Sequence, residues 1–162
     1  MKASIIIPVY NAEKTLDATM ESVMHQTVND FEVILIDDCS TDNSEYVCKK
    51  WKASDIRIKY FRNKENSGPS FTRNFGINIA QGEWILFVDS DDLITENFIE
   101  KLTSIPNVDL IWGNFEYYYP MNDKIIKTDH NYRGHLSYKE MLKCFASPKD
   151  GIGSLCNKAY RR

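Results

Sequence analysis

The feature that most constrains the fold of this chain is an alternation of short apolar runs with amphipathic segments through about its first hundred residues. The apolar runs are short and end in Pro, Asn or Asp, which is typical of strands, while the segments between them carry apolar residues at helical spacing. This order predicts β-α-β-α-β-α-β-α. We therefore expect an α/β fold with a mixed, mostly parallel central sheet flanked by helices.

The boundaries of these elements follow from local signals. Helices are expected to begin at Asn11 as a cap, at Asp42 with Glu45 in a capping-box spacing, and at Pro69. Gly82 is expected to close the third helix. The run 33–36 is continuously apolar and predicts a strand covered on both faces, whereas 56–60 alternates with charge and predicts a wet face or an edge. The expected strands are 4–9, 33–36, 56–60, 84–88 and 108–112.

The part of the chain after Gly113 carries weaker signals. Residues 115–119 and 124–127 have strand character with a turn between them, and Ser137 with Glu140 has the spacing of a capping box for a short helix to Phe145. The sequence contains no internal repeat, low-complexity tract or linker. A single domain over 1–162 is therefore expected.

Composition excludes several classes of function. The charged fraction is 27%, the formal net charge is -3, and there is no long basic run, so a nucleic-acid partner is not expected. No segment approaches the roughly 20 apolar residues of a membrane-spanning helix, and the start lacks a signal-peptide core. A cytoplasmic protein is expected. The four cysteines are widely spaced without a C-x-x-C pair, which favours buried or incidental thiols over a zinc site or disulfides.

Polar clusters follow the expected strands at 8–11, 37–38, 66–74 and 89–92. Ligands of open α/β sheets bind outside the carboxyl ends of the strands, where helix N-termini offer free N–H groups. One acidic strand end is commonly a helix cap. Two acidic strand ends, together with a loop that carries an arginine, predict a ligand site.

The acids at 89–92 have the chemistry of a site for a hard divalent cation. Asp89 and Asp91 are close enough in sequence for their carboxylates to converge, and oxygen ligands suit Mg²⁺ or Mn²⁺. Crowded carboxylates repel one another unless a cation is present. A D-x-D triplet alone is a weak signal, because such triplets also occur as solvated charge, but its place directly after an apolar strand strengthens it.

The polar clusters lie in blocks that together resemble glycosyltransferase family 2, and in particular its bacterial inverting members. The resemblance is carried, in order, by SIIIPVYN, by QT followed by FEVILIDDCSTDNS, by the Gly-rich stretch with Arg73 and Asn74, by WILFVDSDD, and by the final NKAYRR. The first four of these blocks, in order over about ninety residues, are far more specific than one motif. The resemblance implies a GT-A fold and transfer of a sugar from a nucleoside-diphosphate sugar, with UDP-sugars favoured, to a hydroxyl acceptor with inversion.

The resemblance also implies roles for residues. Asp38 is expected to accept a hydrogen bond from the base, Arg73 to reach the base or a phosphate, and Asp89 to contact the ribose. Asp91 is expected to be the principal ligand of Mn²⁺ or Mg²⁺, with Asp89 beside it, while Asp92 orients its neighbours or caps a helix. The residues expected near the base and ribose are Pro8, Tyr10 and Asn11.

An inverting transfer also needs a carboxylate to take the proton of the acceptor hydroxyl. In the resembled family this base lies in an acidic pair downstream of a segment like 155–162, so it is expected beyond Arg162 and no catalytic residue is assigned. The chain is accordingly expected to be a truncated N-terminal part of a catalytic domain. Residues 1–92 would form its donor- and metal-binding half and residues 93–162 the start of its acceptor half.

Other interpretations stay open. The chain could be a non-catalytic fragment that binds nucleotide-sugar, or a nucleotidyltransferase, although 10–13 is not the Gly-rich basic loop that the latter needs. The aromatic residues of 115–119 offer either a platform for an acceptor sugar or alternating burial along a strand. The expected acceptor is a saccharide or lipid-linked molecule of cell-surface polysaccharide synthesis. The expected location is the cytoplasm, with peripheral contact to the inner face of the membrane through a region beyond Arg162 as a further option.

Overall fold

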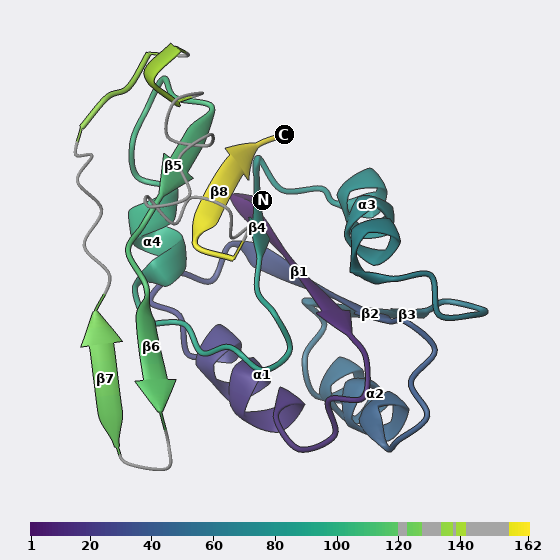
Figure 1. Cartoon of the computed structure of the whole chain (residues 1–162). Coiled ribbons are helices and arrows are strands. Elements are labelled where there is room, and N and C mark those ends of the chain that lie inside the picture. The colour runs from purple at the N-terminus through teal and green to yellow at the C-terminus, as the bar shows by residue number, and fades with distance from the viewer. Residues whose placement is uncertain (120–122, 128–133, 138, 142–155) are drawn as a thin grey trace.

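The computed structural model of the chain describes residues 1–119, 123–127, 134–137, 139–141 and 156–162. Strands and helices alternate over the first part of the chain as the sequence predicts (Figure 1). The elements are β1 (Ala3–Val9), α1 (Leu16–Met24), β2 (Phe31–Asp37), α2 (Ser44–Ser54), β3 (Ile58–Arg62), α3 (Pro69–Ile79), β4 (Trp84–Phe87), α4 (Phe98–Leu102), β5 (Leu110–Trp112), β6 (Glu116–Tyr119), β7 (Lys124–Lys127) and β8 (Lys158–Arg161).

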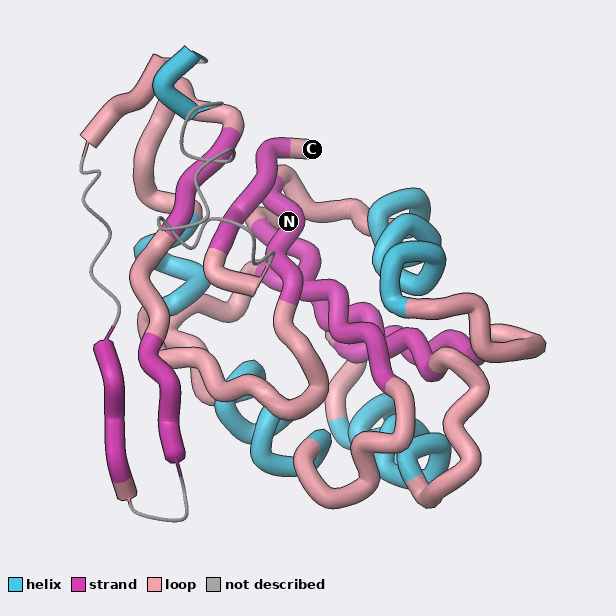
Figure 2. The backbone as a smooth tube through the Cα atoms, viewed as in Figure 1, coloured by secondary structure: helices cyan, strands magenta, loops and turns pink. Residues whose placement is uncertain are grey.

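The central sheet has six strands in the order β3-β2-β1-β4-β8-β5. Figure 2 draws the strands of the chain in magenta, in the same view as Figure 1. The neighbours β3, β2, β1 and β4 pair in parallel, and β8 pairs antiparallel with both β4 and β5. The expected mixed, mostly parallel sheet flanked by helices is therefore confirmed. Strand β3 lies at the sheet edge, as the alternation of its charged residues indicates.

Helices cover both faces of this sheet and divide the core in two. The larger cluster packs α1, α2 and α4 against one face, and the smaller cluster packs α3 against the other. Every residue of β2 is buried because its side chains alternate between the two clusters. Covering on both faces is the physical reason for the continuous apolar run in this strand.

Close backbone contact fixes the turn that joins α3 to β4. A Cβ added to Gly82 would lie 2.4 Å from the backbone nitrogen of Ser4, so only glycine fits here. The Ser4 hydroxyl accepts a hydrogen bond from Gly82 N at 2.8 Å and donates to the buried Glu32 carboxylate at 2.6 Å. Lys59 neutralises Glu32 at 2.7 Å. This turn determines where β4 begins and therefore where its acidic loop emerges.

Several expected element boundaries are wrong. Helix α1 begins at Leu16 after Thr15, because Asn11 has a left-handed φ of 50° and bonds to a different loop. Helix α3 ends at Ile79, so Gly82 serves the close contact described above rather than the helix end. Ile56 is fully exposed and precedes β3.

The expected capping box of α2 is also wrong. Asp42 accepts hydrogen bonds from the backbone of Ser44 and of Glu13, whereas Glu45 pairs with Arg62 instead of returning to the helix start. Asn43 occupies the cap position. Glu45, which would close the capping box, instead forms an ion pair with Arg62 on the neighbouring strand β3.

The later part of the chain returns to the main sheet. Strand β8, which the sequence did not predict, inserts between β4 and β5, while the expected hairpin is confirmed as β6 and β7. The capping pair of Ser137 and Glu140 is confirmed, with the Ser137 hydroxyl donating at 2.6 Å. The expected helix to Phe145 and the thiol of Cys144 lie outside the described residues. No helix in the described ranges is long and apolar enough to cross a membrane.

Candidate functional site

A cavity of about 220 Å³ opens where the carboxyl ends of β1, β2 and β4 meet the N-terminus of α3. The position fits the general rule for ligand sites in open α/β sheets, which lie outside the carboxyl ends of the strands and beside helix N-termini. Six of the seven residues that the sequence predicts for donor or metal binding line this cavity. They are Pro8, Tyr10, Asp38, Arg73, Asp89 and Asp91.

The buried carboxylate of Asp38 organises one wall of the cavity. Its Oδ1 accepts hydrogen bonds from Asn63 Nδ2 at 2.7 Å and Ser67 N at 2.9 Å, and its Oδ2 accepts one from Gly68 N at 2.8 Å. Burial opposes ionisation, but these hydrogen bonds outweigh it and hold the pKa of Asp38 below its ordinary value. Asp38 is therefore an ionised acceptor that anchors the loop before α3.

Asn11 is the one predicted site residue that does not line the cavity. Its backbone N–H donates to the Ser40 hydroxyl at 3.1 Å, and its side-chain oxygen accepts from Thr41 N at 2.9 Å. Asn11 and Cys39 both adopt left-handed backbone, with φ of 50° and 62°. Such strain persists only where surrounding contacts enforce it. Asn11 thus ties the loop after β1 to the loop after β2, beside the cavity rather than in it.

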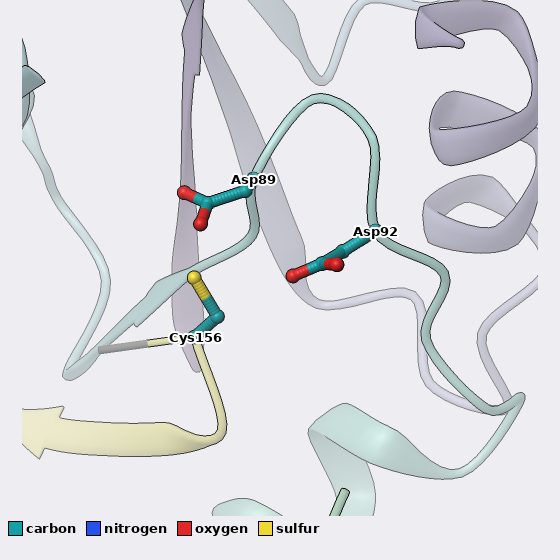
Figure 3. A group of neighbouring side chains, drawn as sticks. All are labelled: Asp89, Asp92 and Cys156. Carbon is teal, nitrogen blue, oxygen red and sulfur yellow. The ribbon is translucent and has the colours of Figure 1, made fainter. Parts of the chain in front are cut away.

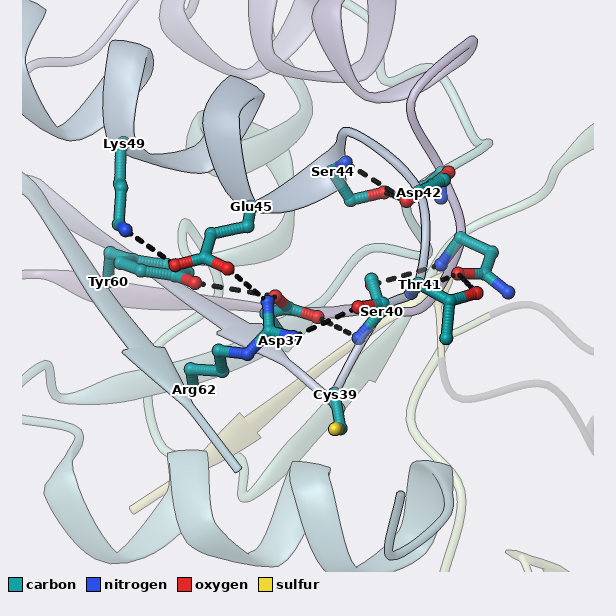
Figure 4. A network of polar contacts seen from close by, with 12 residues as sticks. Asp37, Cys39, Ser40, Thr41, Asp42, Ser44, Glu45, Lys49, Tyr60 and Arg62 are labelled. Atoms are coloured by element: carbon teal, nitrogen blue, oxygen red, sulfur yellow. Dashed lines mark hydrogen bonds and ion pairs between the residues drawn. The ribbon is translucent and has the colours of Figure 1, made fainter. Parts of the chain in front are cut away.

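An ionic network around the buried Asp37 holds the loop after β2 in place (Figure 4). Asp37 is fully buried and accepts from Ser40 N at 2.8 Å, which closes the turn through Cys39. Arg62 donates to Asp37 Oδ2 at 2.6 Å and to the Ser40 carbonyl at 2.9 Å. The sequence predicts no separate roles for Asp37 and Arg62. One signal for this pair is present in the sequence. Strand β2 ends in Asp37, and the neighbouring strand β3 ends in Arg62.

Arg73 connects α3 to the acidic loop after β4. Its Nη2 donates to Asp89 Oδ1 at 2.6 Å, and the side chain is only 18% exposed. Within the described part of the chain, the buried Nε of Arg73 has no hydrogen-bond partner. A buried guanidinium N–H without a partner is costly, so this side of the cavity favours an additional anionic acceptor.

The acidic loop converges on a thiol from a distant segment. Ligand atoms of Asp89, Asp92 and Cys156 lie within 4.8 Å of one another, and Figure 3 shows the three side chains pointing toward a common space. Partial burial, and then the carboxylates of Asp89 and Asp91, raise the pKa of Asp92. Burial and a hydrogen bond to Asp89 raise the pKa of the Cys156 thiol to about 12.

The donor set of this loop fits a divalent cation. Carboxylate oxygens are the ligands that Mn²⁺ and Mg²⁺ prefer, and a cation would relieve the crowding that raises the pKa of Asp92. Asp91 is exposed and lies on the cavity side, whereas Asp92 belongs to the cluster with Cys156. The sequence did not predict that Asp92 and Cys156 converge, because 63 residues separate them and no local spacing links the two.

Known proteins resemble this chain in sequence and in fold. The family model "Glycosyl transferase family 2" matches residues 4–162. The Escherichia coli enzyme WfgD, a UDP-Glc:alpha-D-GlcNAc-diphosphoundecaprenol beta-1,3-glucosyltransferase, is 35% identical over 94% of this chain and 57% of its own length. The structure of Staphylococcus aureus TarS 1-349 with UDP-GlcNAc is similar, with a TM-score of 0.67 and 29% identity over 99% of this chain and 45% of that one.

A third similar structure is GalNAc-T7 with UDP, GalNAc and Mn²⁺, with a TM-score of 0.57 and 27% identity over 63% of this chain and 20% of that one. The chain thus spans about half the length of WfgD and of the TarS structure. The mixed, mostly parallel sheet flanked by helices is that of GT-A glycosyltransferase structures. On the match over residues 4–162, the chain belongs to glycosyltransferase family 2.

Proposed function

We propose that this chain forms the donor site of a glycosyltransferase that moves a sugar from a UDP-sugar to a hydroxyl acceptor with inversion. The observation that carries the proposal is the cavity that gathers Asp38 and Asp89 from two strand ends and Arg73 from α3. It offers an ionised acceptor at one wall and an incompletely bonded guanidinium near the acidic loop. A nucleoside diphosphate has the complementary groups, with N–H donors on its base and anionic oxygens on its phosphates.

The base end of the donor is assigned to the wall formed by Tyr10 and Asp38. The ring of Tyr10 is 50% exposed beside the cavity, so it is available to flank a flat base. Asp38 accepts a hydrogen bond from the imide N–H of uracil, which adenine lacks. Pro8 lines the same wall, and Asn11 acts there by bracing the neighbouring loop. This chemistry favours UDP over adenine nucleotides.

The phosphate end is assigned to Arg73 and the acidic loop. Arg73 donates to a phosphate oxygen through its guanidinium group, while Asp89 contacts the ribose. Asp91 would be the principal ligand of Mn²⁺ or Mg²⁺, with Asp89 beside it. A bound divalent cation supplies charge neutralisation of the departing diphosphate. The GalNAc-T7 structure, which holds UDP with Mn²⁺, supports this assignment by similarity.

The proposed reaction is a single displacement. The acceptor oxygen forms a bond to the anomeric carbon as the bond from that carbon to the diphosphate oxygen breaks, and UDP leaves with the electron pair. The hydroxyl proton passes to a carboxylate base, which we assign to no described residue. We propose that 1–92 form the donor and metal half and that 93–162 begin the acceptor half. We propose that the acceptor is a saccharide or lipid-linked molecule of cell-surface polysaccharide synthesis, and the diphosphoundecaprenol-linked acceptor in the name of WfgD supports the lipid-linked choice.

A thermal-unfolding screen with UDP, GDP and ADP, each in Mn²⁺ and in EDTA, tests the donor assignment. UDP with Mn²⁺ is expected to stabilise the chain by about 2.7 kcal/mol at a concentration of about 100 times its Kd, with much smaller gains in EDTA. Asp30→Asn, which changes a carboxylate that is 73% exposed far from the cavity, is the matched control for Asp91→Asn. Equal stabilisation by all three nucleotides would overturn the choice of UDP, and equal stabilisation in EDTA the metal assignment.

A further inference from the structure

Asn63, the residue directly after β3, does not line the donor cavity but bonds to a residue that does. Its side chain donates to Asp38 Oδ1 at 2.7 Å, and Asp38 forms part of the cavity wall. The sequence predicts no role for Asn63, and the proposed donor site gives it none. Any effect of Asn63 on a bound nucleotide must therefore pass through Asp38.

The backbone of Asn63 is fixed to the central sheet. Its N–H donates to the Asp37 carbonyl at 2.8 Å, which continues the parallel pairing of β2 with β3. Asp37 is the last residue of β2 and directly precedes Asp38. The two side chains that meet, those of Asp38 and Asn63, thus project from positions held by the same ladder of backbone hydrogen bonds. Asn63 is a rigid support for the carboxylate rather than a mobile loop contact.

The side-chain amide of Asn63 is held in one orientation. Its Nδ2 donates to Asp38 Oδ1 at 2.7 Å and to the hydroxyl oxygen of the fully buried Thr72 at 3.2 Å. An amide carries its two donor hydrogens on this nitrogen, so both have a partner. The reversed orientation would place the amide oxygen of Asn63 against the Asp38 carboxylate, where two acceptors would face each other. The amide therefore directs a donor at Oδ1.

This arrangement determines which oxygen of Asp38 is left for a ligand. An ionised carboxylate oxygen has two lone pairs, and Oδ1 accepts both from Asn63 and from Ser67 N at 2.9 Å. Oδ2 accepts from Gly68 N at 2.8 Å and keeps a second lone pair. The Thr72 hydroxyl lies near the same carboxylate, but its one proton goes to the Gly68 carbonyl at 3.0 Å. Oδ2 is thus the oxygen that can accept from a nucleotide base.

We propose that Asn63 is a positioning residue for recognition of the base. It holds the Asp38 carboxylate turned so that Oδ2 accepts the N3–H of a uracil ring. This inference rests on the proposed function, because Asp38 rather than Asn63 contacts the base. Hydrogen bonds weaken steeply as they depart from linearity, so a carboxylate that is free to rotate makes a weaker bond to the base. The contacts to the ribose and the diphosphate do not depend on this rotation.

A purely structural role for Asn63 leads to a different result. If the amide only stabilised the loop 63–68, its loss would weaken the binding of every nucleotide that fits the cavity by the same factor. If the amide orients Asp38, its loss weakens the binding only of nucleotides that carry an N3–H. UDP and 3-methyluridine diphosphate separate the two roles, because they differ only in the methyl group that replaces this hydrogen.

Calorimetry in Mn²⁺ measures the Kd of both nucleotides for the unmodified chain and for Asn63→Ala. The unmodified chain should bind UDP at least about tenfold more tightly than the methylated nucleotide, which cannot donate to the charged acceptor. In Asn63→Ala the Kd of UDP should rise by about tenfold and that of the methylated nucleotide by less than about twofold. An equal rise for both nucleotides, or no rise for UDP, would overturn the proposal.

Two more substitutions of Asn63 keep the test decisive if Asn63→Ala folds poorly. Asn63→Ser, whose hydroxyl is too short to replace the amide, should lose discrimination between the two nucleotides in the same way. Asn63→His should regain most of it, because the Nδ1–H of histidine stands as many bonds from the backbone as the Nδ2–H of asparagine. Discrimination as poor in Asn63→His as in Asn63→Ser would overturn the proposal, since a donor at this place would then not be what matters.

Asn29→Ala is the matched control. Asn29 precedes β2, at the end of the strand away from the cavity, and its side-chain oxygen accepts from Arg57 at 3.3 Å. Its loss removes a side-chain hydrogen bond of the same kind and should leave both Kd values unchanged. A loss of discrimination in Asn29→Ala equal to that in Asn63→Ala would overturn a specific role for Asn63.

The unmodified chain separates failure of this proposal from failure of the proposed function. If it does not bind UDP, the proposed function is wrong and the role of Asn63 with it. If it binds UDP and the methylated nucleotide equally well, the contact between Asp38 and the base is wrong. If it discriminates between them and Asn63→Ala discriminates as well, the donor site stands and only the positioning role of Asn63 is wrong.

Discussion

Replacement of Asp38 by Asn tests whether its carboxylate holds the donor wall as an ionised acceptor. An Asn side chain can keep its oxygen toward Asn63 and Ser67, but it then places an NH₂ group against the backbone N–H of Gly68. The charge-assisted hydrogen bond from Gly68 N is lost, and the NH₂ group and this N–H then face each other as two donors. The hydrogen bonds from Asn63 and Ser67 remain, but they become neutral. Because a hydrogen bond to a charged group contributes about 1.5 to 3 kcal/mol, we expect Asp38→Asn to destabilise the chain by about 2 to 4 kcal/mol.

The pH dependence of this effect has a definite sign. The pKa of Asp38 is lower in the folded chain than in the unfolded one, where it is about 3.9. Its contribution is therefore fully present above the unfolded pKa and is lost as the pH falls toward the folded pKa. The difference in unfolding free energy between the unmodified chain and Asp38→Asn should be constant from pH 5 to 7 and shrink below about pH 4.

Urea unfolding at several pH values measures both effects. The midpoint should fall without a change in the slope of free energy against urea, since the same surface is exposed on unfolding. Asp30→Asn, at a carboxylate that is 73% exposed, should change stability by less than about 0.5 kcal/mol. A loss below 0.5 kcal/mol for Asp38→Asn, or a loss that grows toward low pH, would refute the account of this wall.

Three further predictions concern the donor cavity and its support. Arg73→Met should weaken UDP binding by roughly 10- to 100-fold in calorimetry, because a charged donor to phosphate is removed, and Arg73→Lys should recover only part of it. Asp91→Asn should abolish most of the Mn²⁺-dependent gain in UDP affinity while leaving the melting temperature of the free chain unchanged or higher, since like-charge repulsion is relieved; an unchanged affinity would make Asp91 a surface acid only. Gly82→Ala should lower the unfolding free energy by about 1 to 3 kcal/mol in urea titration, because its Cβ would meet backbone 2.4 Å away; a neutral result would mean that the turn relaxes freely.

Much of the fold could be predicted from the sequence because its determinants are local. The run in β2 is continuously apolar since both of its faces are covered, and the charged alternation in β3 follows from its place at the sheet edge. Strand β8 could not be predicted in this way. Its four residues, Lys158–Arg161, become a strand only by pairing with β4 and β5, which depends on tertiary contacts rather than on periodicity.

The same distinction applies to the site. Strand-end position brought Asp38 and Asp89 to one cavity, because parallel strands end at one edge of the sheet. Asn11 was expected to cap α1, but bonds to the Ser40 and Thr41 loop compete with capping and hold it in left-handed backbone. The approach of Cys156 to the acidic loop depends on the register of β8, which no local pattern specifies.

The central claim is that the strand-end cavity binds UDP together with a divalent cation. A crystal structure of this chain grown with UDP and Mn²⁺ tests it most directly, because manganese is identified by its anomalous scattering. We expect the manganese peak at ligand distance from Asp91, the diphosphate against Arg73, and the uracil between Tyr10 and Asp38. Nucleotide bound outside this cavity, or a manganese peak that touches no carboxylate of 89–92, would contradict the account.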